Sequence, residues 1–243
     1  MRTRTICVSS IIIALLLMGS SAYGITSAIA TEAISSNQPS IISITYGVHV
    51  PPLPSVCCDD AYEFHLGMLS SNNASFVKTT ISYACQISEY KACFPPFQNI
   101  YIFYVSFIQT SSSSIERVQS PPNGYQLTPD SKYTITLSTS VCLKPLSQSI
   151  RLSISNATAT FNDDVCGAPI QQYTSIAAGL LEMHNVTQCS QLPNSGSFIQ
   201  SNIVVNNNPA LVFNWKAMPT NPIIDCGYAL AFTNNSVKIS WKS

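Results

Sequence analysis

Charged side chains are scarce in this sequence. They make up 9% of its 243 residues, whereas about a quarter is usual in a soluble domain. Eleven basic residues balance eleven acidic ones, and they form no Lys/Arg cluster. A nucleic-acid-binding protein needs a concentrated basic surface, so this composition argues against that class. Hydrophobic residues make up 46% of the chain, which excludes a protein that is disordered throughout.

Long apolar runs are also rare. Ile6 to Met18 is shorter than the roughly 20 residues that a membrane-spanning helix needs. It follows Arg2 and Arg4, and small residues come after it at the spacing of a signal-peptidase site. We therefore expect residues 1–24 to be a signal peptide and the mature protein to be secreted, with no membrane span. Residues 25–39, which include Glu32, are expected to be a polar N-terminal tail.

Cysteine usage agrees with secretion. Nine cysteines are present, and Cys7 would leave with the signal peptide. The remaining even number favours disulfides, which form in oxidising compartments. Their pairing is open, except that the adjacent Cys57 and Cys58 should bond to different partners. No C-x-x-C pair suggests a zinc site. The predicted disulfide cysteines are Cys57, Cys58, Cys85, Cys93, Cys142, Cys166, Cys189 and Cys226.

Glycosylation sequons occur along the whole predicted mature chain. Each is an asparagine followed two positions later by Ser or Thr, with no Pro between them. A sequon that carries a glycan must lie on the surface. The predicted glycosylation sites are Asn73, Asn156, Asn185 and Asn234.

Apolar and polar residues alternate with the period of a β-strand. Tyr133 to Ser138, Ile150 to Ser155 and Val237 to Lys242 each predict a strand with one face in the core and one in water. Ile100 to Ile108 is apolar on both faces, as expected of a central strand covered on both sides. The residues predicted to be buried on this basis are Leu137, Leu152, Phe213 and Trp241.

The fold class predicted is all-β. Turn signatures rich in Pro, Gly and Asn separate about ten short strands, which indicates a disulfide-stapled antiparallel β-sandwich. Only Ile170 to His184 could hold a helix, although Gly179 weakens that interpretation. The Ser-rich stretch Gln109 to Ser120 is expected to be a long loop. We expect a single domain over residues 40–243, with a possible subdivision near 110–122.

Two segments of the second half carry a family resemblance. Gly124 to Ser138 is a Pro-containing turn that leads into a Tyr-led alternating strand. It resembles the strand entry of galactose-binding-like jelly rolls, which include many carbohydrate-binding modules. Phe198 to Trp215 is similar to the penultimate hairpin of such modules, and Asp225 to Trp241 would supply closing strands. The resemblance implies a jelly-roll-like sandwich more than it implies a ligand.

Catalytic motifs are nearly absent. There is no G-x-S-x-G or H-E-x-x-H sequence. Two E-x-H pairs, Glu63 with His65 and Glu182 with His184, would each share one face of a strand. If the pairs converged they would form a metal or acid–base site. We expect that they do not converge, because the two segments are far apart in sequence, and therefore predict that the protein is not an enzyme.

Other candidate ligand residues lie in expected loops and surface positions. Asp163 and Asp164, together with Asn162, supply the oxygen atoms that a structural Ca²⁺ ion prefers, although adjacent aspartates are also common in turns. Tyr125 and Tyr173 stand in polar surroundings and are candidates for exposed, sugar-stacking rings. The predicted ligand contacts are Tyr125, Asn162 and Asp163.

Three functions remain open at this point. The main interpretation is a secreted, non-catalytic glycoprotein module that recognises an extracellular glycan or a cell-surface or matrix component. The alternative is a structural glycoprotein of a coat, matrix or cell wall. The third is a secreted hydrolase, which the small number of acid–base side chains disfavours. No cofactor is expected beyond a structural Ca²⁺ ion.

Overall fold

The computed structural model describes residues 27–36, 38, 40–54, 61–71, 75–84, 100–110, 115–142, 147–168 and 170–242. These residues form an all-β protein with one short 3-10 helix, Cys189–Gln191. The strands are β1 (Ser27–Ser35), β2 (Ser43–His49), β3 (Ala61–Ser70), β4 (Ser75–Ala84), β5 (Ile100–Thr110), β6 (Ile115–Leu127), β7 (Lys132–Cys142), β8 (Ser147–Ser155), β9 (Thr160–Ala168), β10 (Tyr173–His184), β11 (Ser197–Val205), β12 (Lys216–Ala217), β13 (Ala229–Thr233) and β14 (Ser236–Ser240).

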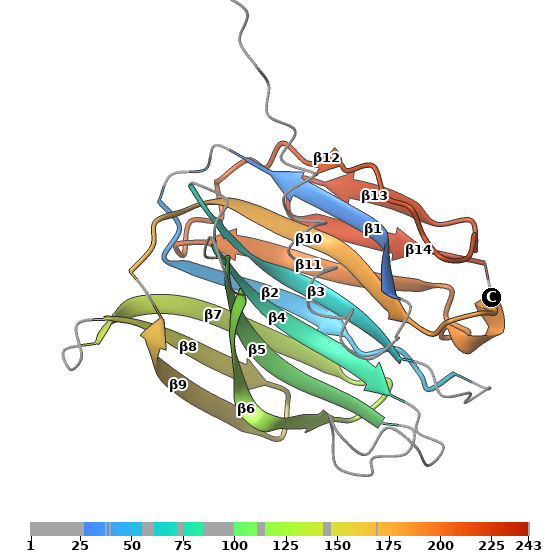
Figure 1. Cartoon of the computed structure of the whole chain (residues 1–243), viewed down its shortest axis with the longest axis horizontal. Helices are drawn as coiled ribbons and strands as arrows, with labels where there is room; N and C mark the ends of the chain where they lie inside the picture. Colours follow the sequence, from blue (N-terminus) through green and yellow to red (C-terminus); the bar gives the residue numbers. More distant parts are fainter. Residues whose placement is uncertain are drawn as a thin grey trace, which may run out of the picture.

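The strands form two antiparallel seven-stranded sheets (Figure 1). Sheet A has the order β12-β1-β10-β3-β4-β5-β6, and sheet B has the order β13-β14-β11-β2-β7-β8-β9. The chain crosses between the sheets repeatedly, so β3 and β10, which are far apart in sequence, are neighbours at the centre of sheet A. This pairing positions the candidate site.

The core lies between the two sheets. Phe64 of β3 stacks on Phe198 of β11, with ring centroids 4.0 Å apart. Tyr46 of β2 shares a 2.6 Å hydrogen bond with Thr79 of β4, so a buried hydroxyl pair also joins the sheets. Burying a large apolar side chain contributes about 1.5–3 kcal/mol, and this layer of rings is what holds the sandwich together.

Several predictions about strands are confirmed. Leu137, Leu152, Phe213 and Trp241 are all buried. The segment predicted to be apolar on both faces becomes β5, in which Phe103 and Tyr104 are both fully buried although their side chains point to opposite faces. The all-β sandwich and its antiparallel pairing are likewise as predicted.

The segment expected to hold a helix is instead a long strand. β10 runs from Tyr173 to His184 and pairs with both β1 and β3. Gly179 has a φ of +60°, and a Cβ atom there would lie 2.5 Å from a methyl carbon of Val237. The glycine therefore allows a bulge, since the register with β3 shifts between Ala177 and Leu180.

Two segments expected to be irregular also belong to the sheets. The predicted N-terminal tail contains β1, which pairs with β10, and Glu32 within it is fully buried. The predicted loop Gln109 to Ser120 is largely strand, because β5 continues to Thr110 and β6 begins at Ile115. β6 pairs with β5 through the region suggested as a subdivision. Both segments are strands because they hydrogen-bond to a neighbouring strand, and the amino-acid composition of a segment does not reveal such pairing.

Two disulfides staple the second half of the chain. Cys142 bonds to Cys166, which ties the end of β7 to β9, and Cys189 bonds to Cys226. Cys57, Cys58, Cys85 and Cys93 lie outside the described residues. Within the part of the chain that is described, no helix is long and apolar enough to cross a membrane.

Candidate functional site

The face of sheet A that points away from the core carries acid–base side chains at its centre. On β3, Glu63 and His65 flank the core residue Phe64. On β10, Glu182 and His184 alternate with core residues in the same way. Because successive strand residues point to opposite faces, both pairs project from the same outer face.

Strand register brings the two pairs together. Glu63 and Glu182 are direct partners in the antiparallel pairing of β3 with β10. The Nε2 atom of His65 lies 3.3 Å from Oε2 of Glu63 and 3.3 Å from Oε2 of Glu182. The Nε2 atom of His184 lies 3.6 Å from Oε1 of Glu182. We refer to Glu63, His65, Glu182 and His184 as the Glu–His cluster.

Three side chains from β4 and β5 complete its surroundings. Tyr104 donates a 2.7 Å hydrogen bond to Oε1 of Glu63. The Nζ atom of Lys78 lies 3.8 Å from Oε2 of Glu182 and 3.4 Å from Nε2 of His65. Thr80 Oγ1 lies 2.9 Å from Nδ1 of His65. Glu63, His65 and Glu182 are therefore each oriented by a partner on a nearby strand.

Burial and charge act against each other in this cluster. Burial opposes ionisation of Glu182, but the hydrogen bond with His65 and the charges of Lys78 and His184 outweigh it and lower its pKa to about 2. Burial likewise opposes ionisation of Glu63, and the charges of His65 and His184 bring its pKa below the usual range. Burial, and next the ammonium of Lys78, lower the pKa of His65 and outweigh the opposing effect of the two neighbouring carboxylates.

The expectation that the two E-x-H pairs do not converge is wrong. They meet because β3 and β10 are adjacent and in register at Glu63 and Glu182. The one feature of the sequence that could have indicated the site was the repeated E-x-H spacing, which occurs once in each of two segments long enough to be strands. The prediction failed because it took the long separation along the sequence as a sign of separation in space, whereas the sheet order places β10 beside β3.

A buried glutamine from the other sheet fixes the two strands. Gln200 of β11 donates a 2.8 Å hydrogen bond from Nε2 to the carbonyl oxygen of His65. Its Oε1 atom accepts a 2.7 Å hydrogen bond from the backbone N–H of Gly179. The Gln200 side chain thus links β3 and β10 through hydrogen bonds made from the core side of sheet A. Sequence analysis missed it together with Lys78, Thr80 and Tyr104, since nothing in the sequence marks a lone polar residue as part of a site.

The residues predicted to contact a ligand or Ca²⁺ lie on sheet B. Asn162, Asp163 and Asp164 belong to β9, and all three line one open surface depression. Asp164 accepts hydrogen bonds from Ser149 and, at 2.9 Å, from Nε of Arg151. Adjacent strand residues point to opposite faces, so the two aspartate side chains diverge. Calcium binding there remains a prediction.

The two predicted exposed rings are not free platforms. Tyr173 is 1% exposed and donates a 2.9 Å hydrogen bond to Gln148, so that prediction is wrong. Tyr125 is half-buried and stacks on Phe161 of β9, with ring centroids 4.9 Å apart. Both side chains contact a strand of the opposite sheet, and the polarity of the residues around them in the sequence does not reveal this contact.

Three of the predicted glycosylation sites lie near strand ends. Asn156 lies between β8 and β9, Asn185 follows β10, and Asn234 lies between β13 and β14. Asn73 lies outside the described residues. Attachment of glycans remains a prediction at all four.

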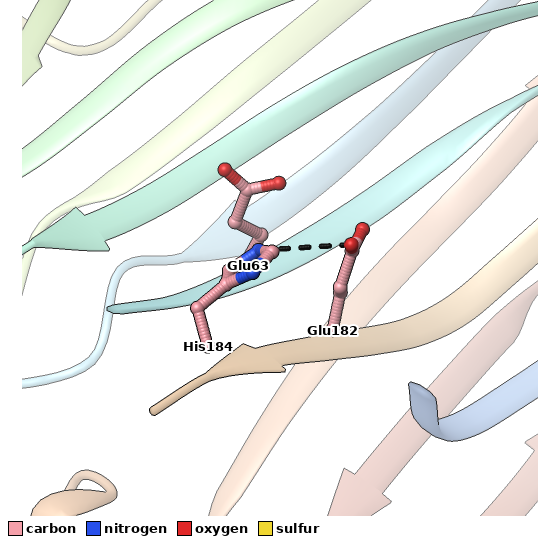
Figure 2. Close-up of side chains that lie close together, drawn as sticks. All are labelled: Glu63, Glu182 and His184. Atoms are coloured by element: carbon pink, nitrogen blue, oxygen red, sulfur yellow. Dashed lines mark ion pairs between the residues drawn. The ribbon is translucent and has the colours of Figure 1, made fainter. Parts of the chain in front are cut away.

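The cluster also contains a set of possible metal ligands. One ligand atom each from Glu63, Glu182 and His184 can be chosen so that all three lie within 4.8 Å of one another. Figure 2 shows these side chains, with Glu182 and His184 rising from β10 and Glu63 coming from the neighbouring strand. Among the described residues this is the only such group of three histidine, cysteine or carboxylate side chains.

Comparisons with known proteins identify the fold through structure. The sequence matches no protein-family model and no curated protein. Two structures of scytalido-glutamic peptidase, one with a peptide-based transition-state analogue and one with a transition-state analogue inhibitor, give TM-scores of 0.52 and 0.50 at 9% and 8% identity. SCP-B, a member of the eqolisin family of peptidases in complex with the tripeptide Ala-Ile-His, gives 0.51 at 9% identity. Each comparison covers 89% of this chain and 99% of the other.

These findings correct the predicted family and function. The resemblance to galactose-binding-like jelly rolls is wrong, because the structures similar to this chain are peptidases. It relied on a Pro-containing turn and an alternating strand within Gly124 to Ser138, and such motifs occur in many antiparallel β-folds. The non-catalytic glycan-binding function and the expectation of no enzyme activity are contradicted by the same comparisons.

Proposed function

We propose that the protein is a secreted hydrolase of peptide bonds, with the Glu–His cluster as its reaction centre. The observation that carries this proposal is the meeting of Glu63 and Glu182 at one imidazole, His65, with both contacts at 3.3 Å. Its fold is that of solved peptidases bound to transition-state analogues or a tripeptide. Fold alone does not establish an activity, so the geometry of the cluster is the stronger support.

The cluster contains the groups that hydrolysis of an amide requires. The pKa of Glu182 is lowered to about 2, so its carboxylate can accept a proton from a water molecule placed against it. This transfer is most effective at acid pH, since a general base works best near its own pKa. The resulting hydroxide would attack the carbonyl carbon, the C–N bond would break, and the proton would pass from Glu182 to the leaving nitrogen. The ammonium of Lys78, 3.8 Å from Glu182, offers positive charge to the oxyanion that forms during attack.

The remaining members hold this arrangement in place. Tyr104 orients Glu63 through its hydrogen bond, and Thr80 fixes the ring of His65 from the Nδ1 side. The side chain of His184 is 20% exposed, compared with 8% for Glu182. The edge of the cluster at His184 is thus the more open side, and a substrate would enter there.

Peptide cleavage by the purified protein tests the proposal. A mixture of peptides of varied sequence would be incubated with the protein from acid to neutral pH, and new termini would be identified by mass spectrometry. We expect cleavage by the wild type and a loss of about 10²- to 10⁴-fold in Glu182→Gln, the contribution typical of general acid–base groups. Asp164→Asn is the matched control, because it changes a carboxylate on the other sheet.

Failure to detect any cleavage by the folded wild type across this pH range would contradict the proposal. Equal cleavage by the wild type and Glu182→Gln would contradict the assignment of the reaction centre. Chelator would be present in one arm of the assay, so that cleavage by a contaminating metalloprotease is recognised.

Secretion belongs to the same proposal. The disulfides Cys142–Cys166 and Cys189–Cys226 support it, since stable disulfides are usual in oxidising compartments. We expect the protein recovered from the culture medium to begin after Gly24. N-terminal sequencing checks this, and a mature protein that retains Ile6 to Met18 would contradict it.

A further inference from the structure

We propose that Glu63, Glu182 and His184 form a binding site for one divalent transition-metal ion, with Zn²⁺ the ion that fits best. The three residues come from neighbouring strands, β3 and β10, in direct register. Their ligand atoms lie within 4.8 Å of one another (Figure 2). This inference goes beyond the proposed hydrolysis and does not depend on it.

The mix of donor atoms selects the class of ion. Two carboxylate oxygens and one imidazole nitrogen suit Zn²⁺, which accepts both donor types and four-coordinate geometry. Ca²⁺ and Mg²⁺ prefer oxygen donors alone and more of them. Three protein ligands would leave one position of a tetrahedral ion for water.

The spacing of the ligand atoms requires little movement. Zinc lies about 2.0–2.2 Å from its nitrogen and oxygen ligands, so two ligand atoms of a tetrahedral ion lie about 3.4 Å apart. His184 Nε2 and Glu182 Oε1 are already 3.6 Å apart. Rotation of the Glu63 side chain about its flexible bonds would bring its carboxylate oxygen, which lies within 4.8 Å of the other two ligand atoms, to the third position.

Charge around the ligands also favours a cation. Two carboxylates face one ammonium, that of Lys78, so the group carries net negative charge when its imidazoles are neutral. Lys78 approaches Oε2 of Glu182, whereas His184 approaches Oε1. A metal ion at Oε1 therefore does not have to displace the lysine.

The surroundings provide the hydrogen bonds that metal ligands usually have. Tyr104 donates to Glu63, and His65 Nε2 lies against Oε2 of both glutamates. Such outer partners orient ligands, and their removal typically weakens metal binding about 10- to 100-fold. Because the ion would occupy Glu63 and Glu182, metal binding and the proposed hydrolysis should exclude each other.

Calorimetric titration of the purified protein with Zn²⁺ tests the site, with Co²⁺ as a visible-absorption probe of coordination. We expect one ion per chain and a Co²⁺ absorption spectrum typical of a low-symmetry site with an imidazole ligand. Binding should be lost in His184→Gln and in Glu63→Gln. In Tyr104→Phe, binding should be about 10- to 100-fold weaker. His184 lies at the end of β10 and is partly exposed, so its replacement leaves the core intact. Circular dichroism would verify this.

The matched control is His49→Gln. His49 pairs with the exposed Asp130 at 3.0 Å, so it is a histidine–carboxylate pair outside the cluster, and its replacement should leave binding unchanged. No binding of Zn²⁺ by the wild type, or undiminished binding in both His184→Gln and Glu63→Gln, would overturn the inference. Zinc binding without peptide cleavage would contradict only the proposed function, and cleavage without zinc binding would contradict only this site.

Discussion

The outer faces of the two sheets both carry ion pairs, but in opposite surroundings. On sheet B, Arg151 and Asp164 pair at 2.9 Å with side chains that are 61% and 47% exposed. On sheet A, Lys78 and Glu182 pair at 3.8 Å with side chains that are 3% and 8% exposed. Water screens the first pair and weakens its attraction. The charges of the second pair are buried, so neighbouring protein groups must supply the hydrogen bonds and opposite charges that water would otherwise provide. The comparison shows that burial, rather than the residue types, makes one group a candidate reaction centre.

Removing Lys78 should produce the largest difference between the two faces. Lys78→Met leaves Glu63 and Glu182 buried without their ammonium, and breaking a buried charge network typically costs about 3–5 kcal/mol in the free energy of unfolding. Arg151→Met on sheet B should cost less than about 1 kcal/mol. Urea unfolding at neutral pH measures both. Similar losses in the two variants would mean that the faces do not differ.

Glu32 should make the stability of sheet A depend on pH. Burial raises its pKa from 4.5 to about 7, and its carboxyl oxygens have no hydrogen-bond partner. The folded state therefore holds its proton more tightly than the unfolded state. The resulting stabilisation is complete below about pH 4.5 and is lost as pH rises through 7, a change of about 3 kcal/mol.

The variant Glu32→Gln should remove most of this pH dependence. Chemical denaturation at a series of pH values between 4 and 8 would compare the free energies of unfolding of variant and wild type. Stability of the wild type that increases over this range, with the same slope in Glu32→Gln, would contradict the assignment to Glu32.

Gln200 should matter less, but it links the sheets at the cluster. Gln200→Leu leaves the N–H of Gly179 and the carbonyl of His65 without partners, and each unsatisfied buried group costs about 1–3 kcal/mol. We expect a loss of about 2 kcal/mol together with reduced peptide cleavage. The exposed Gln126 supplies the control, Gln126→Leu, which should change neither property. An unchanged free energy of unfolding in Gln200→Leu would show that the hydrogen bonds of Gln200 do not stabilise the fold.

The smallest effect is expected on sheet B. Asp164→Asn removes the negative charge that faces Arg151, and exposed ion pairs of this kind contribute about 0–1 kcal/mol. Unfolding at low and high salt would measure the difference, which should shrink further at high salt. A loss of more than about 2 kcal/mol in the free energy of unfolding would mean that Asp164 is essential for stability. The ion pairs on the two sheets would then not differ in strength as proposed.

Much of the fold was predictable from local pattern. The alternation in Tyr133 to Ser138 and in Ile150 to Ser155 correctly gave β7 and β8, since period-two hydrophobicity is imposed by one buried face. The strand at Ile100 to Ile108 was predictable from its continuous apolar run, since a strand covered on both sides is apolar on both faces. β1 was not, because its short side chains and Glu32 form no alternating pattern and only pairing with β10 makes it a strand.

The candidate site was half visible in the sequence. The two E-x-H pairs named its four central residues, but their meeting depends on β3 and β10 being neighbours, which is a property of sheet order. Lys78, Tyr104 and Gln200 carried no signal, because each acts through a contact made only in the folded chain. Local spacing can propose which side chains share a face, whereas topology decides which faces meet.

The ratio of kcat/KM between wild type and Glu182→Gln, on a peptide found to be cleaved, tests the central claim most directly. The same ratio for Asp164→Asn measures how much kcat/KM changes when a carboxylate outside the cluster is lost. The Glu–His cluster as reaction centre predicts that Glu182→Gln lowers kcat/KM by about 10²- to 10⁴-fold, with Asp164→Asn close to wild type. A folded Glu182→Gln protein that cleaves the peptide as fast as the wild type would contradict it.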